Sequence, residues 1–311
     1  MHNDGIYQSQ LPVRALMNDL ESLANLDKES EKKISYWSKI RILLFVLGLV
    51  ALLLGLFSVE HRWGIEAWAF MGALGMVIIW CVITFSTLKK LNRDEFPDYR
   101  YLTCQKLLGL LSADIDNHSE IETRLTLKEK LSPNQTIEKG KKGSSTWNRR
   151  NTSECFLSLN GVFLDGTKFR CSITEEVQAY GEHFPYRSLS GKTKTKLKAN
   201  KRTRWIGALR LRFKEKRYSS SPTESQQIED LIQIPDRAKL KKLEVNDQEL
   251  LMRSATETNK QKHKVKMSKD IPAAWDDMEI DANSSDMLKA FMAQMFLSLY
   301  QTLNSSKTKR K

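Results

Sequence analysis

The chain has 311 residues, and its 50 lysines and arginines outnumber its 37 aspartates and glutamates, giving a formal net charge of +13. This excess of positive charge favours an anionic partner, such as lipid headgroups or an acidic protein. The four cysteines include no C-x-x-C pair, which excludes a zinc-ribbon or redox signature of that kind. We find no metal-ligand spacing or cofactor motif, so we expect neither a metal nor a cofactor.

Two apolar stretches near the N-terminus, residues 42–59 and 67–88, contain no charged side chain. A membrane-spanning helix needs about 20 apolar residues, with about 17 as the lower limit. The two stretches therefore predict a two-pass transmembrane hairpin that anchors the chain in the lipid bilayer. Basic residues flank the outer ends of the hairpin, so we expect an integral protein of the plasma (inner) membrane with both termini cytoplasmic.

Small residues recur at four-residue spacing within both apolar stretches. This spacing lets helices pack closely, either within the hairpin or between copies of the chain in a homo-oligomer. The helix-packing positions predicted in this way are Ala51, Gly55, Ala69 and Ala73.

The remaining elements follow the periodicity of the apolar residues. Residues 1–10 are polar and predict disorder, and an amphipathic helix follows from Pro12 to Trp37. Residues 94–114 predict a second helix, whereas residues 121–128 alternate apolar and polar side chains as a half-buried strand does. The polar segments 132–152, 181–203 and 260–269 show neither the helical nor the strand spacing of apolar residues, and we interpret them as loops.

Residues 155–180 give the clearest hairpin signal, because Asp165-Gly166 is a strong two-residue turn between two alternating runs. A two-residue turn at this position pairs Asn160 with Cys171. We expect a β-bulge at Asn160-Gly161, since one extra residue there keeps the apolar side chains of the first strand on a single face.

The strand predicted at residues 204–217 carries its apolar side chains on one face and a basic stripe on the other. A basic loop leads into it, and together they form the predicted anion or lipid contact. Its residues are Arg210, Arg212, Lys214, Lys216, Lys192, Lys194, Lys196 and Lys198. A short helix at 224–234, a hairpin at 239–253 and an amphipathic helix at 285–303 complete the prediction.

The predicted fold class is a membrane protein in which the transmembrane hairpin carries a cytoplasmic α+β domain with a mainly antiparallel sheet and a C-terminal amphipathic helix. The expected domains are an N-terminal segment (1–40), the hairpin (41–88), the α+β domain (89–304) and a basic tail (305–311).

We interpret the protein as a non-enzymatic, membrane-anchored interaction or scaffold module. One alternative is an oligomerising membrane effector or channel subunit. Another is a tethered enzyme, for which Glu182, His183 and the acidic segment 114–120 are the candidates. Nucleic-acid binding is disfavoured, because the aromatic residues of strand 204–217 face inward with the leucines, whereas single-strand binders expose aromatic side chains.

Overall fold

The computed structural model describes residues 5–60, 97–127, 137–187, 193–213, 238–257 except 247, 259–265 and 284–305, with residue 232 and a few positions between 75 and 87. The chain divides into two compact units. Unit 1 comprises residues 1–19 and 97–311, and unit 2 comprises residues 20–96.

Helix α1 (Val13–Glu60) is a single continuous helix of 48 residues that begins in unit 1 and continues through unit 2. It runs without a break from the charged segment 28–41 into the apolar stretch at 42–59, so the predicted helix start at residue 42 is wrong. The second apolar stretch, 67–88, lies outside the described residues apart from isolated positions.

Among the residues that the structure describes, no helix combines the length and the apolar character needed to cross a bilayer. This finding overturns the predicted transmembrane hairpin, and with it the membrane fold class and the integral-membrane localisation with cytoplasmic termini. The prediction treated residues 42–59 as a separate helix, whereas they form the last part of α1, which starts at Val13. The side chains of Ala51 and Gly55, and all of Ala69 and Ala73, lie outside the described residues.

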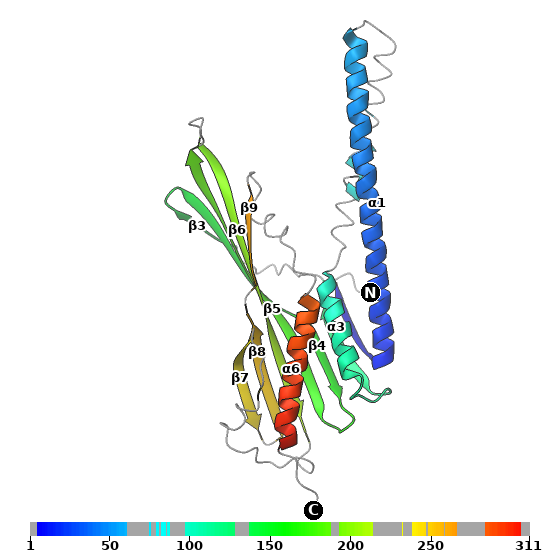
Figure 1. Ribbon diagram of the computed structural model, residues 1–311, viewed down its shortest axis with the longest axis vertical. Helices are drawn as coiled ribbons and strands as arrows, with labels where there is room; N and C mark the ends of the chain where they lie inside the picture. The colour runs from blue at the N-terminus through cyan, green and yellow to red at the C-terminus, as the bar shows by residue number, and fades with distance from the viewer. Residues whose placement is uncertain are drawn as a thin grey trace, which may run out of the picture. The chain divides into compact units, whose positions relative to one another are not determined.

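Unit 1 is built on a nine-stranded sheet in which every described pair of neighbours is antiparallel (Figure 1). The main path runs β1-β2-β4-β5-β6-β8-β7, while β3 pairs with β4 and β9 pairs with β6. The strands are β1 (Ile6–Pro12), β2 (Glu120–Thr126), β3 (Glu138–Lys142), β4 (Ser145–Val162), β5 (Lys168–Arg187), β6 (Thr193–Arg212), β7 (Ala238–Asn246), β8 (Glu249–Thr256) and β9 (Asn259–Val265).

Strands β4, β5 and β6 have 18, 20 and 20 residues, and each serves two parts of the sheet. In one part, which we call the body, they are flanked by β1 and β2 on one side and by β8 and β7 on the other. In the other part, which we call the wing, they are flanked by β3 and β9. The wing comprises residues 138–142, 145–154, 175–187, 193–204 and 259–265.

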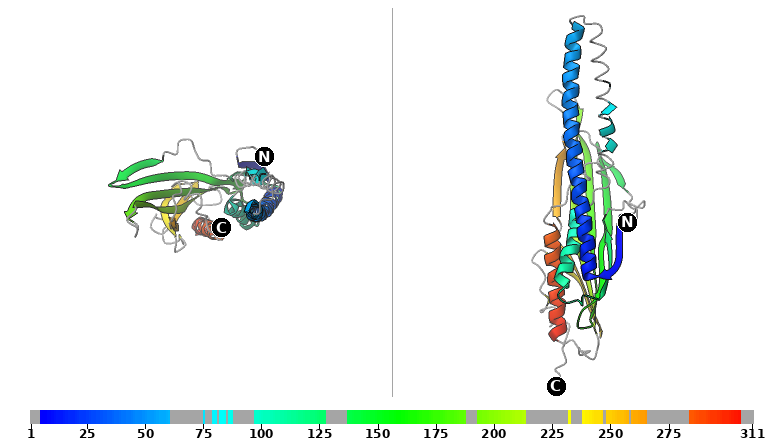
Figure 2. Two further views of the ribbon diagram at one scale, coloured as in Figure 1. Left: turned by 90° about the horizontal axis from the view of Figure 1, so that it is seen from above. Right: turned by 90° about the vertical axis from the view of Figure 1, so that its right-hand side faces the viewer.

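Helices α3 (Asp98–Leu111) and α6 (Ser284–Ser305) lie side by side against one face of the body (Figures 1 and 2). Gly207 of β6 allows α6 to approach, since a Cβ atom there would lie only 2.7–2.8 Å from side-chain atoms of Phe291, Met292 and Met295. Within the body, the odd-numbered residues 169–173 of β5 and 205–211 of β6 are buried on this helix-covered face. The even-numbered ones are exposed or half-buried on the opposite face, which we call the helix-free face.

The three segments predicted to be polar loops contribute strands to the wing. Segment 132–152 contains β3 and the start of β4, segment 181–203 contains the end of β5 and the start of β6, and segment 260–269 contains most of β9. These predictions were wrong because the wing strands are rich in polar residues and lack the apolar alternation that identifies a half-buried strand. Residues 1–10 were likewise predicted to be disordered, yet β1 begins at Ile6.

The β4–β5 turn occurs at the predicted place but has a longer loop. The Phe163 amide donates to the Thr167 carbonyl at 2.9 Å, and the Gly166 amide donates to the Phe163 carbonyl at 2.8 Å. Gly166 has a φ of 83°. This is the three-residue hairpin in which a left-handed residue follows a tight turn.

The longer loop shifts the strand register by one residue, and such a shift exchanges the two faces of a strand. Asn160 pairs with Arg170 rather than with Cys171. The bulge predicted at Asn160-Gly161 is therefore unnecessary there, and the register irregularity lies between Cys155 and Leu157.

We predict that Gly166→Val lowers the free energy of unfolding by about 1–3 kcal/mol, because a β-branched side chain resists the left-handed backbone conformation. Denaturant unfolding of the purified protein measures this loss. Gly109→Val is the matched control, since a Cβ atom at Gly109 of α3 meets no atom within 4 Å. Equal stability of the two variants would contradict the assigned turn.

Candidate functional site

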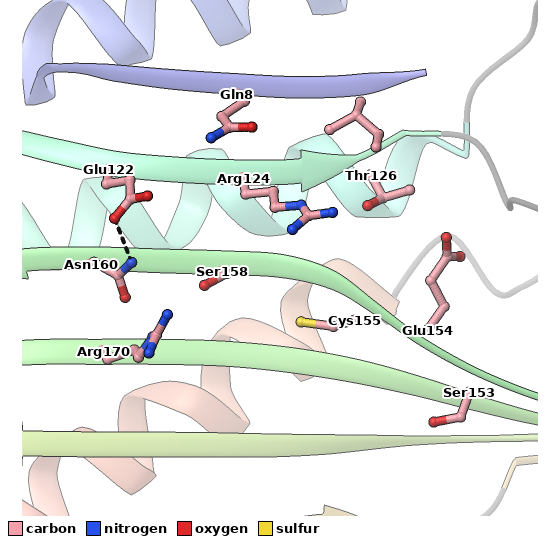
Figure 3. Close-up of a pocket in the computed structure, with 11 residues that line it drawn as sticks. Gln8, Glu122, Arg124, Thr126, Ser153, Glu154, Cys155, Ser158, Asn160 and Arg170 are labelled. Atoms are coloured by element: carbon pink, nitrogen blue, oxygen red, sulfur yellow. Dashed lines mark hydrogen bonds between the residues drawn. The ribbon is translucent and has the colours of Figure 1, made fainter. Parts of the chain in front are cut away.

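A pocket of about 520 Å³ opens on the helix-free face of the body, over strands β1, β2, β4 and β5 (Figure 3). Strands β1 and β2 contribute every second residue to its lining, because side chains alternate across a strand, whereas β4 also contributes the consecutive residues 153–155 next to its register irregularity. The polar side chains in its lining include Gln8, Glu122, Arg124, Cys155, Ser158, Asn160 and Arg170. A volume of this size falls within the range of pockets that hold small ligands or protruding groups of a partner.

Two arginines on different strands provide the positive charge of the pocket. Arg124 lies on β2 and Arg170 on β5, with β4 running between them (Figure 3). Both are exposed. Among the described residues, neither arginine has a carboxylate within ion-pair distance, so their charges are available to an incoming anion. A guanidinium group binds a carboxylate or a phosphate through two parallel hydrogen bonds.

One carboxylate of the pocket, that of Glu122, is held by an amide. The Asn160 side-chain nitrogen donates to Glu122 Oε2 at 2.8 Å. The Asn160 Oδ1 atom is buried and has no hydrogen-bond partner among the described residues. The pocket therefore combines two exposed arginines with a fixed carboxylate and a polar floor at Ser158.

Cys155 is the thiol of the pocket, and its environment disfavours a role as a nucleophile. Partial burial raises the pKa of Cys155 above its ordinary value, although Thr174 and Arg124 act in the opposite direction. The thiolate, not the thiol, is the attacking species in cysteine chemistry. Cys155 therefore marks the wall of the pocket rather than a reactive centre.

The residues of the predicted basic stripe fall on different parts of the sheet. Arg210 and Arg212 are exposed on the helix-free face of the body, and Arg210 forms an ion pair with Glu249 at 3.0 Å. Lys198 is exposed on the same face of the wing. Lys194 and Lys196 belong to β6, but their side chains lie outside the described residues, as do Lys192, Lys214 and Lys216 entirely.

The catalytic candidates of the sequence are also separated. Glu182 and His183 are adjacent on β5, so their side chains leave opposite faces of the sheet. The acidic segment 114–120 follows α3 and leads into β2, and its Asp114 and His118 are exposed. The structure therefore does not bring these groups together with the pocket, whose lining they do not join.

A buried charge cluster lies beside the pocket and is centred on Arg100 of α3, whose side chain is fully buried. Its Nη2 atom contacts Glu175 Oε2 at 2.8 Å, and its Nη1 atom contacts Glu154 Oε2 at 3.2 Å. Nη1 also donates to the Thr126 carbonyl at 3.0 Å. Glu154 belongs to the pocket lining as well, so the cluster connects the pocket to the helix-covered side.

Tyr99 completes the cluster. Its hydroxyl accepts from Arg100 Nε at 3.1 Å and donates to Glu175 Oε2 at 2.7 Å. Burial, followed by the charge of Glu175, raises the pKa of Tyr99 well above its ordinary value. Burial alone would lower the pKa of Arg100, but Tyr99 and Glu175 outweigh it and raise that pKa. The phenol is therefore neutral and the guanidinium is charged at physiological pH.

The pocket is not predicted from the sequence. The alternation of residues 121–128 indicates the polar face of β2, which includes Arg124, but nothing in the sequence brings that face next to Arg170. The predicted register paired Asn160 with Cys171, whereas the structure pairs Asn160 with Arg170. A three-residue loop at the β4–β5 turn is the signal that would have corrected the register.

Comparison with protein families, curated proteins and solved structures found no match for this chain. The fold by itself defines an antiparallel-sheet protein with helices on one face of the body and an arginine-flanked pocket on the other.

We predict that Arg100→Leu lowers the free energy of unfolding by about 3–5 kcal/mol, because it leaves the buried Glu175 carboxylate without a countercharge. Arg210→Leu, which removes an exposed ion pair, should cost at most about 1 kcal/mol. Denaturant unfolding of both variants gives the comparison. The double variant Arg100→Leu/Glu175→Leu should recover much of the loss, and failure to recover it would contradict the charge argument.

Proposed function

We propose that this protein is a non-enzymatic interaction module that binds an anionic partner through the helix-free face of its sheet. An oxyanion of the partner, either the carboxylate of an acidic protein or the phosphate of a lipid headgroup, enters the pocket between Arg124 and Arg170. The observation that carries the proposal is the pair of arginines without carboxylate partners among the described residues, facing one concave pocket.

Three further features support binding rather than catalysis. The thiol in the pocket has a raised pKa and so a low thiolate population at physiological pH. The Glu122 carboxylate is engaged by Asn160, which limits its repulsion of an anion. The long strands supply a rigid frame, and sites on strands hold their geometry better than sites on loops.

The test is a titration of the purified protein with fluorescent polyglutamate at low salt. An exposed charged pair contributes up to about 1 kcal/mol. Arg124→Gln and Arg170→Gln should therefore each weaken binding by about fivefold, and the double variant by about 25-fold. Binding should also weaken with rising salt, because exposed charges are screened.

Arg253→Gln is the matched control, because Arg253 is an exposed arginine on the same face of the body but outside the pocket. It should bind like the parent. Bound polyglutamate should also slow the alkylation of Cys155 by iodoacetamide, since Cys155 lines the pocket. Vesicles that contain anionic lipid provide the comparison with polyglutamate. If the protein binds these vesicles more tightly than polyglutamate, and if this binding depends on the same two arginines, the partner is lipid. Parent-like binding by the double variant would overturn the proposal.

A further inference from the structure

Two aromatic side chains lie next to each other on the helix-free face of the wing. Trp147 of β4 and Tyr180 of β5 are nearly parallel, with ring centroids 6.3 Å apart and an interplanar angle of 25°. Both are half-buried. They belong to adjacent rows of the sheet, in which Trp147 pairs with Glu182 and Tyr180 pairs with Arg149.

Gly140 of β3 explains why the indole lies flat on the sheet. Trp147 pairs with Gly140, and a Cβ atom at that glycine would overlap the indole ring. The absence of a side chain at Gly140 thus lets the ring rest on the β3 backbone, and the indole remains partly exposed. Trp147 and Tyr180 together form what we call the aromatic platform.

The aromatic platform is surrounded mainly by positive charge. The exposed cations on its face of the wing are Lys142, Arg149, Lys198 and Arg202. Among the described acids of this face, Glu176 is already bound to Arg204 and Glu182 accepts a hydrogen bond from the Tyr180 hydroxyl, which leaves Glu138 at the edge.

We propose that the aromatic platform of the wing binds single-stranded nucleic acid, with bases stacked on Trp147 and Tyr180 and phosphates held by the surrounding cations. Single-strand binders combine a basic surface with exposed aromatic rings, because every base offers a flat face to stack on. Sheet surfaces that bind RNA use aromatic side chains in the same manner. The inward-facing aromatics of β6 argued against nucleic acid at the level of sequence, whereas the platform comes from β4 and β5.

The geometry favours nucleic acid over the other anionic partners. A membrane-binding aromatic residue protrudes so that its ring enters the lipid interface, but Trp147 lies flat against β3. An acidic protein segment would use the cations and gain little from two parallel rings. The Glu182 carboxylate beside the platform adds an acceptor that fits the exocyclic amine of a base such as cytosine.

The experiment measures the anisotropy of fluorescent 15-nucleotide oligo(dC) and oligo(rC) titrated with the full-length protein. Loss of one stacked base lowers affinity by between about fivefold and about 150-fold. Trp147→Leu and Tyr180→Leu should each produce a loss in that range, and leucine keeps an apolar cover on the strand. Gly140→Ala should also weaken binding, because the new methyl group displaces the indole.

Thermal unfolding of each variant checks that the fold is kept, and Trp147→Phe, which retains a smaller ring, should keep more affinity than Trp147→Leu. The double variant Arg124→Gln/Arg170→Gln should bind the oligonucleotides like the parent. Loss of binding in that variant would put the nucleic acid in the pocket and overturn the role of the platform. Parent-like binding by folded Trp147→Leu and Tyr180→Leu, or equal competition by polyglutamate, would overturn the proposal.

Discussion

The sheet depends on the ion pairs and hydrogen bonds of the buried Arg100 guanidinium. It joins α3 to Glu175 of β5, to Glu154 of β4 and to the end of β2 at the Thr126 carbonyl. The ring centroids of Tyr99 and Phe156 lie 5.9 and 5.4 Å from the guanidinium carbon of Arg100. Because a buried charge is tolerated only when it is paired and hydrogen-bonded, this cluster fixes how the helix sits on three strands.

The cluster also lies at the boundary between the body and the wing. Glu154 directly precedes the register irregularity between Cys155 and Leu157, and Glu175 pairs with Glu154 across the two strands. Beyond this point the long strands continue with β3 and β9 as neighbours. The helix-free face is therefore continuous from the arginine pocket in the body to the aromatic platform in the wing, which gives one sheet two distinct binding surfaces.

The sequence predicts the elements of the body well where one strand face is apolar, as in β2 and in the β7–β8 hairpin, and it predicts α6 from its apolar stripe. It does not predict the wing, because polar residues dominate the wing strands. Strands that pair through backbone hydrogen bonds without an apolar face show no alternation of apolar and polar residues in the sequence. It misses the pocket for a different reason, since a loop longer by one residue changes the register and brings Asn160, rather than its neighbour, opposite Arg170. The transmembrane prediction, made from two uncharged runs, is contradicted because no described helix combines the length and the apolar character needed to cross a bilayer.

The central claim is that polar, basic segments of this chain form an ordered continuation of the sheet. Amide hydrogen exchange of the purified protein tests it directly, because paired strands exchange slowly and unpaired chain exchanges fast. The structure predicts strong protection for the amides of residues 177–183 in β5 and 199–203 in β6, which pair with each other and with β4 or β9. Exchange of these amides at the rate of an unstructured peptide would contradict the account.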